Sequence, residues 1–418
     1  MNTKRPLKIL IPLHTLPTIP LVHTRIIESI LPYLEKKYTV ELNWFVYTPN
    51  KIKLKSKKHK ILDIHNYSNA VEVIKDTKPD IIYTHATSSL DPHFAISLAA
   101  KFLNIPVFSG IWADRWLKTN NKKQFLSYIT QFLENRERMK FFIFKIFFVN
   151  NTLKVVGFSK LESILKLYKI SKKYFKNNKG YDPEFPSELH WLENNSLFDE
   201  MDKLGYKKDS LVVTGNPLYD LPIKRIRDFK YHQKTNKKIQ VLFVTSLIAE
   251  HGIWTVKQRD EVVKKVVGHI ATNKKFNLEI KISSLENYSK YSSLVHSIDK
   301  NIRIYQDGDF MDYLEKADVV ISFSGVTSVA IFTLLARKPL IITNFFNSKG
   351  DKVLENEIAM DCQNPLQLTN LIQSRLEKNN EEKIEKFINE TFYKEDGNAS
   401  ERLSKSLINL IEKNRIES

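Results

Sequence analysis

Residues 317–345 place the strongest constraint on the fold of this chain. Two short apolar runs, at 319–321 and 340–342, are typical of strands that are buried on both faces of a parallel sheet. Between them lie a loop of small and hydroxyl side chains, residues 322–328, and an apolar stretch with the length of a helix. The segment therefore predicts a strand, a loop, a helix and a second strand, in this order.

This loop has two interpretations. A loop that follows a parallel strand and opens a helix presents unpaired backbone N–H groups and the positive end of the helix dipole, which suits a phosphate. The predicted contacts are Ser324, Gly325, Thr327 and Ser328. Alternatively, the hydroxyl groups only cap the helix, as they do in many such units.

Length and composition favour two domains and a reducing compartment. At 418 residues the chain exceeds what one core usually supports. A single cysteine excludes an intramolecular disulfide framework. No N-terminal signal pattern and no run long enough to span a bilayer is visible, so we expect a cytoplasmic protein.

The net charge predicts anionic partners. The formal charge is +18, from 65 Lys and Arg against 47 Asp and Glu. No zinc spacing, RNA-binding signature or helix-turn-helix pattern supports nucleic acid, and we expect none. The basic, aromatic stretch 125–149 is either a helix on an anionic membrane surface, at the inner face of the membrane, or a core helix that runs into a strand over 155–158.

Strands and helices alternate along most of the chain. The clearest unit of the first half is a strand within 79–86, a helix over 92–103 and a strand within 105–110. In the second half, strands over 240–245 and 278–282 enclose a helix over 257–271. This alternation predicts an α/β fold with two Rossmann-like, doubly wound parallel-sheet domains that face a cleft.

The domain boundaries follow from a charged, apolar-poor stretch near the middle of the chain. We expect an N-terminal domain over residues 1–222, a linker over 223–238 and a C-terminal domain over 239–392. The remaining residues, 393–418, are expected to form a C-terminal helix.

Three segments of the second half should meet, because the carboxyl ends of parallel strands share one edge of the sheet. They are the polar loop 245–255, the strand end at 281–284 and the loop 324–328. One nucleotide diphosphate could touch all three. In addition to the residues of the loop 324–328, the predicted binding residues are Ser246, Gly252, Lys281, Ser283, Gln306 and Phe310.

Four blocks of sequence resemble one family. The block Val-Val-Thr-Gly-Asn-Pro at 212–217 closely matches a junction found in sugar enzymes of the GT-B fold, namely the UDP-N-acetylglucosamine 2-epimerases and related surface-glycan glycosyltransferases. Residues 78–107, 250–255 and 317–340 resemble further parts of the same family. The resemblance spans about residues 7–375. It implies a GT-B-like fold that binds a nucleotide-sugar donor in the C-terminal domain and an acceptor in the N-terminal one.

Departures from the family pattern bear on the reaction. In the epimerases the strand that ends here at 83–87 ends in His-Gly-Asp-Thr, and the next strand leads into a His-x-Glu-Ala-Gly turn. This chain has no carboxylate at the first position and Gly-Ile-Trp-Ala-Asp, residues 110–114, at the second. Because C2 epimerisation needs acid and base groups, the loss of both matched carboxylates argues against it. After the Ser-Gly pair the epimerases carry a glutamate that holds the ribose, where this chain has Thr327, Ser328 and no nearby acid. Many related transferases carry a His-Pro pair where this chain has Ser283 and Ser284. The segment Leu133-Glu134-Asn135-Arg136 resembles the Glu-x-Asn-Arg segment of the epimerases, and this keeps the epimerase alternative open.

We therefore predict a glycosyltransferase that moves a sugar from a nucleotide-sugar, expected to be a UDP-sugar, to a surface-glycan or lipid-linked acceptor. The candidate catalytic residues are His14 and Asp114, as a base at the acceptor hydroxyl, and His251, at the diphosphate or the leaving group. Each could instead be a structural loop residue.

No metal and no cofactor is expected. Residues 307–309, Asp-Gly-Asp, suit a turn with a helix cap better than a metal site. The alternatives to a transferase are a 2-epimerase and a non-catalytic nucleotide-sugar-binding scaffold protein. The sequence leaves the oligomeric state open.

Overall fold

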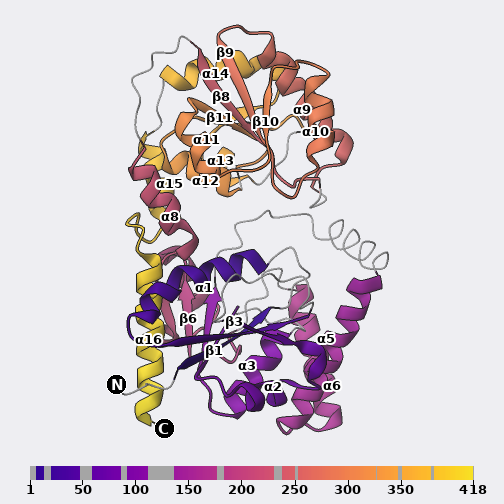
Figure 1. Cartoon of the computed structure of the whole chain (residues 1–418), viewed down its shortest axis with the longest axis vertical. Coiled ribbons are helices and arrows are strands. Elements are labelled where there is room, and N and C mark those ends of the chain that lie inside the picture. The colour runs from indigo at the N-terminus through magenta and orange to yellow at the C-terminus, as the bar shows by residue number, and fades with distance from the viewer. Residues whose placement is uncertain are drawn as a thin grey trace. The chain divides into compact units, whose positions relative to one another are not determined.

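The computed structural model divides the chain into two compact units (Figure 1). It describes residues 6–13, 20–47, 59–85, 92–111, 136–176, 183–229, 238–249, 253–325, 327–346, 351–377 and 381–417. Within these residues, unit 1 comprises the chain up to Asp220 together with the segment from Phe392 onward, and unit 2 runs from Leu221 to Thr391.

Unit 1 contains a parallel sheet of seven strands in the order β3-β2-β1-β4-β5-β6-β7. The order changes direction between β1 and β4, which is the switch point of a doubly wound sheet. The strands are β1 Leu7–Leu13, β2 Val40–Val46, β3 His59–Asp63, β4 Ile81–His85, β5 Val107–Ile111, β6 Leu189–Leu192 and β7 Leu211–Val213. The helices are α1 Pro20–Glu35, α2 Ala70–Thr77, α3 Pro92–Phe102, α5 Arg136–Val155, α6 Lys160–Lys176, α7 Asn195–Lys203 and α16 Ala399–Glu417.

Two apolar cores cover the two faces of this sheet, because successive side chains of a strand point to opposite sides. On one face, Ile9 of β1 belongs to the same core as Ile30 of α1 and Leu407 of α16. On the other face, Leu10 shares a core with residues of α2, α3, α5 and α7, including Phe148. The C-terminal helix is therefore part of the core of unit 1, whereas the sequence analysis assigns it to neither domain.

The turn after β7 anchors this C-terminal helix. The guanidinium group of Arg402 donates to the carbonyl oxygen of Thr214 at 2.8 Å. The carboxylate of Asp220 accepts from the N–H groups of Ala399 at 2.9 Å and Ser400 at 2.7 Å, at the start of α16. The Thr-Gly-Asn-Pro block that carries part of the family resemblance thus has a structural role in this chain.

Unit 2 contains a parallel sheet of six strands in the order β10-β9-β8-β11-β12-β13, with its switch point between β8 and β11. The strands are β8 Ile239–Val244, β9 Phe276–Lys281, β10 Arg303–Tyr305, β11 Val319–Ser322, β12 Leu340–Thr343 and β13 Met360–Cys362. The helices are α9 Val256–Ala271, α10 Tyr288–His296, α11 Phe310–Lys316, α12 Ser328–Leu335, α13 Lys352–Glu355, α14 Leu368–Glu377 and α15 Glu381–Thr391.

These two sheets confirm the predicted fold class, and the cleft between the domains stays a prediction. Helix α8, Asp220–Arg227, occupies the first part of the stretch expected as a linker. None of the described helices is long and apolar enough to cross a membrane.

The strand expected over residues 155–158 is wrong. Helix α5 continues to Val155, and Gly157 takes a φ of +104° in the turn that leads into α6. The core-helix interpretation is confirmed for α5, since Phe141, Phe148 and Leu153 belong to the core of unit 1.

Replacement of Gly215 by Ala tests the anchoring turn. Gly215 has a φ of +84°, and a Cβ there would lie 3.2 Å from the Cβ of Ala399. Gly157→Ala is the matched control, because its φ is also positive while its Cβ would meet nothing within 4 Å. Both variants should lose about 1–2 kcal/mol to the left-handed backbone, and Gly215→Ala should lose about 1–3 kcal/mol more to crowding. Equal decreases in the calorimetric melting temperature would contradict the crowding.

Candidate functional site

Five strands of unit 2 end in one row. Tyr305 of β10 pairs with Lys281 of β9, which also pairs with Val244 of β8. Val244 in turn pairs with Ser322 of β11, whose other neighbour is Ile342 of β12. Adjacent strands lie about 4.8 Å apart, so the part of the row from β10 to β11 spans about 14 Å. The loops that follow these residues therefore lie next to one another at the carboxyl edge of the sheet.

This edge brings together the predicted binding residues that the structure describes. Ser246 follows β8, Lys281 ends β9, and Phe310 begins the helix after β10. The others at the same edge are Ser283, Gln306, Ser324, Gly325, Thr327 and Ser328. His14, Asp114, His251 and Gly252 lie outside the described residues, and their roles stay predictions.

A carboxylate that the sequence analysis does not single out joins two of these loops. Glu286 is 4% exposed and accepts hydrogen bonds from the hydroxyl groups of Thr245 and Tyr291. It also accepts one from the N–H group of Ser283, at 2.8 Å. The loop after β8 and the loop after β9 are thus held by one buried group.

The ammonium group of Lys281 joins the loops after β9 and β10. It donates to the carbonyl oxygens of Ile282 at 2.9 Å and Gln306 at 2.7 Å. Burial lowers the pKa of Lys281, an effect that the carboxylates of Asp307 and Glu286 oppose. The side-chain amide of Gln306 donates to the carbonyl oxygen of Glu286 at 2.7 Å. Two of the three N–H donors of the Lys281 ammonium group are thus engaged by carbonyl oxygens of the protein.

The Ser-Gly pair after β11 has an acidic partner. The carboxylate of Asp351, in the loop after β12, accepts from the N–H group of Gly325 at 2.7 Å and from the hydroxyl of Ser324 at 3.2 Å. It also accepts from the N–H group of Val353 at 3.0 Å. A Cβ at Gly325 would lie 2.6 Å from the Asp351 Oδ1, so this approach requires glycine. The expectation that no acid lies near this loop is therefore wrong, because Asp351 reaches it from a distant part of the sequence.

Thr327 confirms the capping interpretation for its own hydroxyl. This group accepts from the N–H group of Ala330 at 3.2 Å, as the N-cap of α12. Ser328, the first residue of the helix, is exposed. Since the first N–H groups of a helix have no acceptor within the helix, the start of α12 is the part of this loop best suited to an anion.

The acidic turn at 307–309 is a helix cap, as expected. Asp309 accepts from the N–H group of Met311 at 3.0 Å at the start of α11. Arg225 of α8 forms ion pairs with both Asp309, at 2.6 Å, and Asp312. In the part of the chain that the structure describes, no three His, Cys, Asp or Glu side chains are grouped to hold a metal ion.

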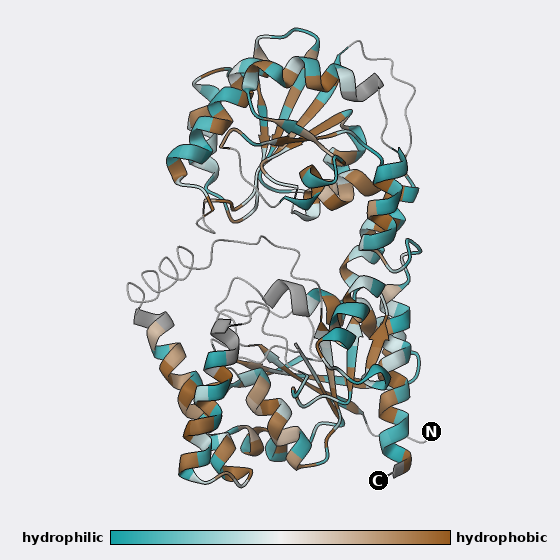
Figure 2. Ribbon diagram, turned by 180° about the vertical axis from the view of Figure 1, so that it is seen from behind, coloured by the Kyte–Doolittle hydropathy of each residue, from teal (hydrophilic) through white to brown (hydrophobic). Residues whose placement is uncertain are grey.

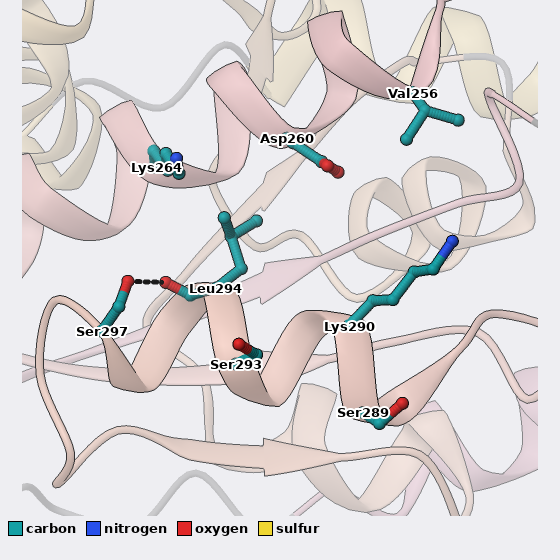
Figure 3. A pocket seen from close by; sticks show the side chains of 8 residues that line it. All are labelled: Val256, Asp260, Lys264, Ser289, Lys290, Ser293, Leu294 and Ser297. Carbon is teal, nitrogen blue, oxygen red and sulfur yellow. Dashed lines mark hydrogen bonds between the residues drawn. The ribbon is translucent and has the colours of Figure 1, made fainter.

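A surface groove of about 520 Å³ lies between α9 and α10 (Figure 3). Leu294 of α10 points toward α9 on this side (Figure 3). None of the lining residues is a predicted site residue. They are Val256, Asp260, Lys264, Ser289, Lys290, Ser293, Leu294 and Ser297.

No family model and no curated protein sequence matches this chain, but solved structures match it over nearly its whole length. A UDP-GlcNAc 2-epimerase from Neisseria meningitidis, bound to UDP-GlcNAc, has a TM-score of 0.52 at 14% identity, with 97% of this chain and 100% of that chain covered. The wall teichoic acid polymerase TagF has a TM-score of 0.54 at 14% identity, with coverages of 99% and 90%. A calicheamicin glycosyltransferase has a TM-score of 0.55 at 11% identity, with coverages of 98% and 99%.

The chain has a GT-B-like fold. Enzymes that epimerise sugar nucleotides and enzymes that transfer sugars share this fold, so the likeness leaves the reaction open. Within the GT-B-like fold of this chain, the row of strand ends lies in the C-terminal unit, where the sequence analysis expects the donor.

Replacement of Glu286 by Ala should lower the free energy of unfolding by about 3 kcal/mol, because buried partners lose their acceptor. The matched control is Glu261→Ala on α9, where an exposed carboxylate pairs with Lys265 at 2.6 Å and little change is expected. Chemical denaturation of both variants measures the difference. Equal small losses would mean that Glu286 does not hold the two loops.

Proposed function

We propose that this chain is a glycosyltransferase that uses a nucleotide-sugar donor, bound at the carboxyl edge of the sheet of unit 2. The observation that carries the proposal is the row of strand ends from Tyr305 to Ser322. Its span of about 14 Å suits an extended nucleotide diphosphate. Solved structures that share the fold include one bound to UDP-GlcNAc and one with UDP, and this supports a UDP-sugar as the donor.

In the proposed reaction, an acceptor hydroxyl attacks the anomeric carbon, and the bond from that carbon to the diphosphate oxygen breaks. The N–H groups at the start of α12, near Ser328, stabilise the charge on the departing diphosphate. Lys281 adds positive charge at the same edge. The proton of the acceptor goes to a base in unit 1, for which His14 and Asp114 are the proposed candidates. A surface glycan or a lipid-linked sugar is the proposed acceptor, and the proposed reaction uses neither a metal nor a cofactor.

One observation favours a second candidate, a sugar-nucleotide 2-epimerase. The family resemblance implies a glutamate that holds the ribose after the Ser-Gly pair, and Asp351 places a carboxylate beside Gly325 from a different loop. Asp351 can therefore take the role of that glutamate at the ribose. The transferase stays the first proposal, because neither of the two epimerase carboxylates of the N-terminal half is matched at its own position in the sequence.

Replacement of Ser328 by Glu tests the donor site. A carboxylate in the first turn of α12 is favourable for the helix but repels a diphosphate. We expect the melting temperature to be kept and the affinity for UDP to fall about tenfold or more. Lys274→Gln is the control, because it makes the same change in charge at an exposed turn before β9, on the amino edge of the sheet.

Isothermal titration with UDP, and with CDP and GDP as competitors for the same site, measures this effect. An affinity that stays unchanged in Ser328→Glu would place the nucleotide elsewhere. An equal loss of UDP affinity in both variants would mean that only the net charge of the chain matters, and not the position of residue 328.

Product analysis separates the three candidate functions once a donor binds. A transferase consumes the UDP-sugar only when an acceptor is present. An epimerase forms a second UDP-sugar without any acceptor. A scaffold protein binds the donor and changes nothing, and this outcome would overturn both enzymatic proposals.

A further inference from the structure

Helix α6 exposes an apolar stripe on the outside of unit 1. Leu161 is 68% exposed and Tyr168 is 64% exposed, and Ile164 and Leu165 are each at least half exposed. These four residues follow the i, i+3, i+4, i+7 spacing of a single helix face. Large apolar side chains gathered in this way mark an interaction surface rather than scattered surface residues.

The opposite side of α6 is buried in the core of unit 1. Ser163 is fully buried, and Ile170 belongs to the core that covers one face of the sheet. The helix is therefore held in place through one face while a second apolar face points outward. Figure 2 shows hydrophobic residues along both α5 and α6. On α5, which packs against α6, Ile143 and Phe147 are also exposed.

The charge of these two helices is strongly one-sided. Residues 136–176 contain eleven Lys and Arg and two Glu, a net charge of +9, which is half of the +18 of the whole chain. Lys160, Lys169 and Lys172 of α6 are exposed beside the apolar stripe. Apolar side chains flanked by lysines fit the interface of an anionic bilayer. The apolar side chains enter the acyl-chain region, while the lysine side chains extend so that their ammonium groups stay in water near the anionic headgroups.

We propose that the outer face of α6, with the exposed residues of α5, docks this chain on an anionic lipid bilayer. Charge complementarity selects this occupant. A second copy of the chain would set one cluster of +9 against another and is disfavoured. Nucleic acid would pair with the lysines but leave the apolar stripe without a matching surface. The docking face does not depend on the donor site, and it would stand if the proposed reaction failed.

The variants that test this proposal replace exposed residues outside the core. Phe148 and Phe141 lie in the core, so replacing them would lower the stability of unit 1. The first variant, called the apolar variant, combines Leu161→Ser, Leu165→Ser and Tyr168→Ser, all at exposed positions of α6. A second variant, with Lys160, Lys169 and Lys172 changed to Gln, removes charge and keeps the apolar stripe.

Flotation of the full chain with vesicles tests the proposal. The vesicles contain phosphatidylcholine either alone or with about one third phosphatidylglycerol. We expect the wild type to bind the anionic vesicles, more weakly as salt increases, and both α6 variants to bind at least about tenfold more weakly. The matched control is Leu285→Ser with Leu366→Ser, which removes two exposed leucines of unit 2 and should bind like the wild type.

Three results would overturn the proposal. One is a wild type that does not bind anionic vesicles. Another is equal binding by the wild type and both α6 variants. The third is a wild type that sediments as a dimer while the variant with Leu161, Leu165 and Tyr168 changed to Ser sediments as a monomer, since a second copy of the chain would then cover the face. Circular dichroism and the melting temperature of each variant show whether the chain keeps its overall fold, and the lysine variant keeps the test valid if the apolar variant does not fold.

Discussion

The carboxylate of Glu286 is the group on which the candidate site depends. A carboxylate that is 4% exposed is stable only when hydrogen bonds replace the water it has lost. Thr245, Ser283 and Tyr291 supply these bonds from the loops after β8 and β9 and from α10. Because the buried carboxylate needs these three hydrogen bonds, the three donors are held in place, and this part of the carboxyl edge has little freedom to rearrange. Lys281 extends the connection to the loop after β10.

A second buried carboxylate, that of Asp351, holds the loop between β11 and α12 in a similar way. Asp351 holds the N–H group of Gly325, and this contact is possible only because residue 325 has no side chain. The loop between β11 and α12 is thus shaped by an acidic side chain, while the start of α12 offers the positive end of a helix dipole. An anionic ligand at this edge meets both signs of charge. A diphosphate bound as proposed would therefore lie at the start of α12 rather than at Gly325.

The sequence predicts the parts of the structure that depend on local pattern. The apolar runs around residue 320 and the hydroxyl-rich loop after them indicate a buried parallel strand that opens a helix, and β11 and α12 form there. The common edge of the loops follows from parallel pairing alone. Local pattern fails at Val155, where β-branched residues favour a strand but the packing of Phe148 and Leu153 in the core keeps the chain helical.

Contacts between distant residues account for what the sequence does not reveal. Asp351 lies 26 residues from Gly325, and Glu286 lies 41 residues from Thr245. Neither acid stands out in a local pattern. The place of α16 in unit 1 depends on Asp220, which is 179 residues before Ala399. One signal was available for Asp351, because an acid that follows the strand next to β11 in the sheet must lie at the same edge.

Hydrogen exchange with and without saturating UDP tests the central claim most directly, because it reports on the backbone N–H groups themselves. The account predicts slower exchange in peptides that cover residues 281–287 and 324–335, with the strongest protection at the start of α12. Peptides from the amino edge of the same sheet, around residues 272–275, should not change. Protection confined to other segments, or none at a UDP concentration that saturates binding, would contradict a donor site at the carboxyl edge of unit 2.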